Sequence, residues 1–105
     1  MKDSKHRRAF EEFAEKAQQE LGDSLQRLVL YGSVARGEET EESDVDVFAV
    51  VETEEQKKWL ERFGAEIGVE HGVLFSLIVR TSNENEGVED SVFGSEVMNN
   101  GEIHV

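Results

Sequence analysis

Two aspartates separated by one residue stand at the start of a strongly apolar run. Asp44 and Asp46 flank Val45, and residues 45–51 are apolar apart from Asp46. Such a run predicts a central strand covered on both faces, and alternate residues of a strand project from the same face. The two carboxylates would therefore lie side by side and repel each other. Because Mg²⁺ binds one or two carboxylates together with phosphate oxygens, we expect Asp44 and Asp46 to be catalytic, metal-binding residues.

A glycine–serine pair lies shortly before the aspartates. Gly32 and Ser33 follow an apolar run at residues 28–31 and open a short helical turn that closes at Gly37. Glycine lets a ligand approach the backbone, and the N–H groups at the start of a helical turn attract phosphate. Ser33 could cap the turn and donate its hydroxyl to a phosphate oxygen, and Arg36 could supply a cation nearby. We therefore expect Gly32, Ser33 and Arg36 to bind a nucleotide.

The glycine–serine pair and the two aspartates are more informative together than either is alone. A glycine–serine turn alone is usually an ordinary loop, and acidic residues at the start of a strand are often only solvated. Here both occur between Gly32 and Asp46, on what should be neighbouring strand ends. Together they predict a site for a metal–nucleotide complex.

The elements that would position this site follow from periodicity and capping residues. A first helix should begin at Asp3 or Ser4 and stop at Gly22, and Thr53 with Gln56 forms a capping box for a second long helix. The expected elements are a helix to residue 21, a strand over 25–31, a helical turn over 32–37, a polar loop over 38–43, a strand over 45–51, a helix from 53 that ends at Gly68, a strand over 73–79, a polar loop over 81–90, a short helix around 92–97 that stops at Gly101, and an edge strand near 103–105.

This order predicts an α/β fold, with a small mixed β-sheet flanked by helices. The link between the first two strands is too short for a parallel crossover, so we expect them to run antiparallel. The 105 residues suit one domain, which we take to span residues 1–105.

Composition narrows the classes of protein. There is no cysteine, and no apolar run approaches the ~20 residues that cross a bilayer, so we expect a cytoplasmic protein without a membrane partner. The 24 acidic residues outnumber 11 basic ones, for a net charge of −13. Because this charge repels phosphate backbones, and the basic clusters at 5–8 and 57–58 are short, we do not expect a nucleic-acid partner.

The spacing of the site residues resembles a known signature. Gly32-Ser33, ten intervening residues and Asp44-Val45-Asp46 resemble the DNA polymerase beta-like nucleotidyltransferase superfamily, and residues 31–37 and 43–47 resemble its minimal nucleotidyltransferase branch. The resemblance implies the nucleotidyltransferase fold, with Mg²⁺ as cofactor and ATP or another nucleoside triphosphate as substrate. It also implies transfer of a nucleoside monophosphate to a protein or small-molecule acceptor, with Gly32 and Ser33 holding the triphosphate and Asp44 and Asp46 the metal.

One departure from that pattern concerns a third carboxylate, which active members usually carry on the following strand. Residues 73–79 contain no acid, and Ser76 is the polar residue nearest the expected place, while Glu70 lies before the strand. A serine cannot act as a carboxylate base at neutral pH. The sequence therefore supports nucleotide binding more strongly than turnover.

Other interpretations stay open at this stage. The resemblance also suggests an antitoxin-like module that binds and neutralises a helical HEPN-type partner, and a degenerate domain that binds no nucleotide is a third alternative. An edge strand at 103–105 would allow a homodimer. The four glutamates of residues 38–42 could repel free triphosphate or gather Mg²⁺.

Among the remaining chemically active side chains, His71 could be a base or a metal ligand, although a histidine before a strand is more often a surface residue. His6 and His104 show no partner in the sequence. Trp59 falls on the apolar stripe of a helix, which favours core packing over stacking on a base.

Overall fold

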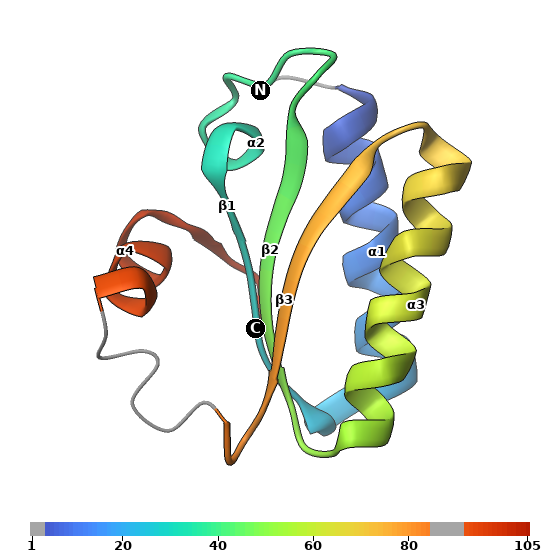
Figure 1. Cartoon of the computed structure of the whole chain (residues 1–105), viewed down its shortest axis with the longest axis vertical. Coiled ribbons are helices and arrows are strands. Elements are labelled where there is room, and N and C mark those ends of the chain that lie inside the picture. The colour runs from blue at the N-terminus through green and yellow to red at the C-terminus, as the bar shows by residue number, and fades with distance from the viewer. Residues whose placement is uncertain (1–3, 85–91) are drawn as a thin grey trace.

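The computed structural model describes residues 4–84 and 92–105 (Figure 1). Its elements, in chain order, are α1 (Lys5–Leu21), the 3₁₀ turn η1 (Gly22–Ser24), β1 (Leu25–Tyr31), α2 (Gly32–Arg36), β2 (Asp44–Val51), α3 (Glu54–His71), β3 (Leu74–Thr81), α4 (Val92–Asn100) and β4 (Glu102–Ile103). This order matches the one expected from the sequence.

The strands form one mixed sheet in the order β3-β2-β1-β4. β1 runs antiparallel to both β2 and β4, whereas β2 and β3 are parallel. The predicted mixed α/β architecture is therefore confirmed, including the antiparallel first pair. The carboxyl end of β1 meets the amino ends of β2 and β3 at one edge of the sheet.

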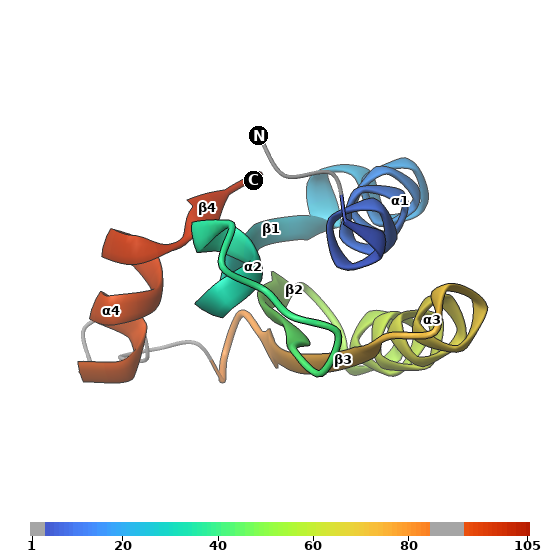
Figure 2. The ribbon, with the colours of Figure 1, turned by 90° about the horizontal axis from the view of Figure 1, so that it is seen from above.

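The two faces of the sheet are covered differently. Figure 2 shows α1 and α3 on one side and α4 on the other. In β2, Val45, Val47 and Ala49 belong to the core formed with α1 and α3, whereas Phe48 and Val50 pack in a smaller cluster with Val97 of α4. Because side chains alternate along a strand, the two aspartates of β2 lie on the α4 face.

Helix α1 begins and ends as its sequence indicates. The Ser4 side chain accepts a hydrogen bond from the Arg7 N–H, and Gly22 follows the last turn with a φ of 52°. Ser4 is thus the N-cap of the helix, and the alternative cap, Asp3, lies outside the described residues. The helix buries an apolar stripe against the sheet, and this stripe comprises Ala9, Phe10, Phe13, Ala14 and Ala17.

Helix α3 begins at the predicted capping box but ends later than predicted. Thr53 and Gln56 make the reciprocal bonds of the box. The helix continues through Gly68 to His71 and stops at Gly72, whose φ of 68° is left-handed. Gly68 is instead a packing residue, because a Cβ there would lie only 2.7 Å from the carbonyl oxygen of Val73. The expected stop at Gly68 was therefore wrong.

The expected short helix and edge strand near the end of the chain are present as α4 and β4. Of the polar loop expected over 81–90, Thr81 belongs to β3 and residues 82–84 form a turn, while residues 85–90 lie outside the described part of the chain. Within the described ranges, no helix is both long and apolar enough to cross a membrane.

Candidate active site

The two aspartates open β2 at the edge of the sheet where β1 ends. Asp44 is exposed and Asp46 is half-buried. Asp46 pairs with Tyr31, the last residue of β1, on one side and with Ser76 of β3 on the other. Residues paired across strands share a face of the sheet, so the Tyr31, Asp46 and Ser76 side chains form a row on the α4 face.

Gly32 brings the predicted phosphate turn against this row. It has a φ of 73°, and a Cβ built on it would overlap the Asp46 carboxylate, with Oδ2 as the nearest atom. Glycine is therefore required twice, for the left-handed backbone and for the space that the carboxylate occupies. The structure thus brings Gly32 and Asp46 into contact at one site.

The electrostatics of Asp46 indicate a crowded acidic site. Burial raises the pKa of Asp46 above its usual value, and the negative charge of Asp44 adds to this effect. The Arg36 guanidinium and a hydrogen bond with Ser76 act in the opposite direction. Burial, followed by the charge of Asp46, also raises the pKa of the Tyr31 phenol.

Mg²⁺ fits this donor set. Two carboxylates on one face repel each other when both are ionised; a divalent cation relieves this repulsion, and oxygen ligands are those Mg²⁺ prefers. Asp44 and Asp46 are the residues that would hold it.

The short helix α2 carries the other predicted nucleotide-binding residues. Tyr31 occupies its N-cap position and makes no side-chain capping bond, and Gly37 ends it with a φ of 71°. Ser33 therefore lies inside the first turn and does not cap the helix, contrary to expectation. Because the helix starts at Gly32, two residues earlier than a serine cap at Ser33 requires, the Ser33 hydroxyl is not committed to capping.

Arg36 lies at the end of α2 and is held by its neighbour. Its Nε donates to Glu38 Oε1 at 2.7 Å, and both side chains are largely exposed. Arg36 is also close enough to lower the pKa of Asp46 by its charge. The guanidinium therefore stands beside the carboxylate pair, where it could meet a phosphate by exchanging its partner.

The glutamate-rich loop is anchored to the first turn of α1 and does not stand free. Glu39 is only 4% exposed and accepts a hydrogen bond from Ser4 Oγ. Glu41 forms an ion pair with Lys5 at 2.9 Å. These long-range contacts with α1 engage Glu39 and Glu41, so the loop does not present four free carboxylates beside the site.

Arg7 adds a third link between α1 and the site. Its guanidinium donates to the Val34 carbonyl at 3.2 Å and to Glu102 Oε1 at 2.8 Å. Lys5 and Arg7, which belong to the basic cluster at residues 5–8, therefore form ion pairs within the fold.

Ser76 is the polar residue of β3 nearest the place where the family pattern would put a third acid. It lies directly opposite Asp46 in the parallel β2–β3 register. β3 contains no acidic residue, so the row of side chains beside Gly32 holds the Asp44 and Asp46 carboxylates and the Tyr31 and Ser76 hydroxyls, with the Arg36 guanidinium nearby.

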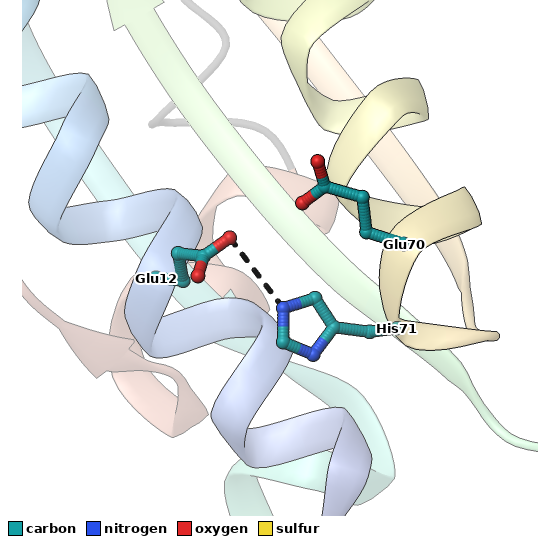
Figure 3. A group of neighbouring side chains, drawn as sticks. All are labelled: Glu12, Glu70 and His71. Carbon is teal, nitrogen blue, oxygen red and sulfur yellow. Dashed lines mark ion pairs between the residues drawn. The ribbon is translucent and has the colours of Figure 1, made fainter.

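A second group of ligand-type side chains lies between the two long helices. Glu12 of α1 and Glu70 and His71 of α3 have ligand atoms within 4.8 Å of one another (Figure 3). His71 Nε2 lies 3.5 Å from Glu12 Oε2, so an ion pair accounts for this pairing. These residues belong to the α1–α3 side of the sheet, whereas the aspartates face α4.

The other aromatic and imidazole groups have structural surroundings. Trp59 stacks on Phe63 with ring centroids 5.1 Å apart and packs against the main core, as predicted. His6 is buried. His104 does have partners, since its Nε2 lies 2.7 Å from Glu102 Oε1 and its ring meets Phe10 edge-on.

Comparison with known proteins agrees with this geometry. Residues 8–102 match the family described as nucleotidyltransferase domain. The chain is similar to a Methanocaldococcus jannaschii protein named "Putative protein adenylyltransferase MJ0141", at 37% identity over 81 residues, covering 66% of this chain and 82% of the relative. No solved structure matches the chain.

Proposed function

Because this chain belongs to the nucleotidyltransferase domain family and is a nucleotidyltransferase, we propose that it transfers AMP from Mg²⁺-bound ATP to a hydroxyl group of a protein. The printed name of the M. jannaschii relative supports ATP as donor and a protein as acceptor. We propose further that residues 1–105 act as one domain.

The contact between Gly32 and the Asp46 carboxylate is the observation that carries this proposal. A phosphate seated on the turn of Gly32 and Ser33 would lie beside the carboxylate pair. Asp44 and Asp46 would hold Mg²⁺ there, and Arg36 would pair with a phosphate oxygen. When bound, Mg²⁺ would neutralise the charge of the triphosphate and of the leaving pyrophosphate.

Catalysis would consist of positioning and charge neutralisation. The acceptor oxygen forms a bond to the α-phosphorus, while the bond from that phosphorus to the bridging oxygen of pyrophosphate breaks. Pyrophosphate leaves with the electron pair, and the hydroxyl proton passes to solvent or to a base that the acceptor brings. Because Ser76 supplies no carboxylate, we expect slow turnover.

Thermal unfolding with ATP and Mg²⁺ tests the binding step. At about 100 times the dissociation constant, ATP should stabilise the fold by ~2.7 kcal/mol. The Asp44→Asn/Asp46→Asn variant should lose this shift and be more stable than the wild type without metal, because the carboxylate repulsion is gone. The matched control, Glu12→Gln/Glu70→Gln, removes two carboxylates from the other cluster and should keep the shift.

Transfer itself is checked with ATP labelled at the α-phosphate and protein acceptors. Label should appear on the acceptor with the wild type and not with the double aspartate variant. A wild type that shows no thermal shift at saturating ATP and Mg²⁺ would contradict the proposal at its first step.

A second candidate function is favoured by the missing acid on β3. A site that binds nucleotide but turns over weakly suits an antitoxin-like module that neutralises a helical HEPN-type partner. If binding alone neutralises the partner, Asp44→Asn should still do so. If transfer is the mechanism, the same variant should fold and fail.

A further inference from the structure

Two large apolar side chains lie exposed beside the candidate site. Val69 of α3 is 84% exposed and Leu74 of β3 is 66% exposed. Both line a groove of about 910 Å³, which we call the α3–β3 groove. Ala65 and Phe75 extend its apolar lining. Exposed apolar side chains grouped along a groove typically mark a surface that binds another molecule.

The α3–β3 groove reaches Asp44, one of the two proposed catalytic residues. Ser43 and Asp44 form part of its lining, and Leu74 is the strand partner of Asp44. Leu74 therefore projects from the same face of the sheet as the two aspartates, whereas Phe75 packs against the core on the helix side. A molecule in the groove would have one end beside the Asp44 carboxylate.

The negative charge along the rim of the α3–β3 groove indicates which kind of molecule can bind there. Glu42, Asp44 and Glu61 line the groove together with the apolar side chains. Such a rim repels a triphosphate and attracts a cation. It also disfavours a second copy of this chain, because each copy carries a net charge of −13. Among the basic residues of the first turn of α1, Lys5 and Arg7 are already paired within the fold.

We propose that the α3–β3 groove docks the acceptor, and that the docked part is a protein segment with apolar side chains flanked by lysine or arginine. The apolar side chains cover Val69 and Leu74, the cations pair with the rim, and a hydroxyl side chain of the segment reaches Asp44. The proposal rests on the proposed function and adds the class of acceptor to it.

Fluorescence anisotropy with two synthetic peptides tests the docking. One peptide combines leucine and lysine around a single tyrosine, and the other has glutamate in place of each lysine. The wild-type protein should bind the lysine peptide and not the glutamate peptide. Val69→Asp and Leu74→Asn should each weaken binding about tenfold or more. Ile103→Asn, at a side chain that is 53% exposed on β4, is the matched control and should not change binding.

Charge reversal provides a second test. Glu61→Lys should weaken binding of the lysine peptide, whereas Glu11→Lys, on an exposed position of α1, should have little effect. In the transfer assay, Val69→Asp should raise KM for the peptide and leave kcat unchanged, because the reacting groups are untouched.

The outcomes separate docking from the proposed function. Equal binding of both peptides, or no change in either groove variant, would overturn docking even when the ATP shift is normal. Selective peptide binding that the groove variants abolish, with no ATP shift in the wild type, would support docking and overturn nucleotide transfer. The thermal unfolding transition of Val69→Asp without ligand should match that of the wild type, which shows that the variant is folded whether or not ATP binds.

Discussion

At the scale of single residues, the site depends on the absence of a side chain at Gly32. The backbone there is left-handed, and its α-carbon lies against the Asp46 carboxylate. Gly32→Ala should cost ~1–2 kcal/mol for the backbone alone, and the added methyl group should displace the carboxylate. We expect lower thermal stability and loss of the ATP-dependent shift.

Gly37 offers a matched control for this prediction. Its φ of 71° is similar, but a Cβ there would meet no atom within 4 Å. Gly37→Ala should therefore show the backbone cost in a thermal scan and retain the ATP shift. Equal loss of the shift in both variants would mean that the Gly32–Asp46 contact is not what matters.

Ser76 is the residue whose replacement should increase activity. It lies opposite Asp46 and is the polar residue nearest the place expected for a third acid. Ser76→Asp should raise kcat for AMP transfer by about 10²-fold, the lower end of what a positioned general base contributes. The same variant should be less stable without metal, because three carboxylates then share the site. Ser76→Asn introduces a side chain with the shape of aspartate but without its charge, so it should not raise kcat.

At the scale of elements, Arg7 joins α1 to α2 and to β4 through Val34 and Glu102. Burial opposes ionisation of Glu102, but hydrogen bonds from Arg7 and His104 outweigh it, so its pKa is lowered in the fold. The resulting stabilisation is present above the pKa of the unfolded chain, near 4.5, and is lost as pH falls through the lower folded value.

Glu102→Gln should therefore lower the free energy of unfolding at pH 7 by less than about 1 kcal/mol, because the pair is partly exposed. The difference from wild type should shrink as the pH falls below the unfolded pKa. Denaturant unfolding at several pH values measures it, with Glu11→Gln as a control without such a partner. A difference that grows in acid would contradict the sign of this linkage.

The sequence indicated most elements because their signals are local. The capping box at Thr53, the apolar run of β2 and the short link between the first strands all act within a few residues. The end of α3 could not be found this way, since Gly68 and Gly72 look alike locally and only the close approach of Val73 distinguishes them.

The candidate site could be predicted from the sequence about as well as the helices and strands. The glycine–serine turn and the aspartates are close in sequence, so strand pairing alone brings them together. The buried state of Glu39 depends on Ser4, 35 residues away, and the α3–β3 groove depends on how a helix packs beside an edge strand. Neither the burial of Glu39 nor the groove produces a periodic pattern in the sequence.

At the scale of the whole molecule, one face of the mixed sheet forms the main core and the other face carries the candidate site. The face covered by α1 and α3 (Figure 2) holds the main core, whereas the aspartates share the other face with Phe48 and Val50. The antiparallel β1–β2 pair places Gly32 beside Asp46, and the parallel β2–β3 pair places Ser76 and Leu74 at the same edge. An all-parallel sheet with these short links between strands would not bring Gly32, Asp46, Ser76 and Leu74 to the same end of the sheet.

The contacts from the first turn of α1 to the glutamate-rich loop also bear on how the molecule opens. Ser4 and Lys5 hold residues that lie 35 or more positions further along the chain, next to the candidate site. Loops beside ligand sites commonly exchange their amide hydrogens through local fluctuations. Here a hydrogen bond and an ion pair tie the loop to the first turn of α1, so we expect the amides of the loop to exchange together with those of that turn.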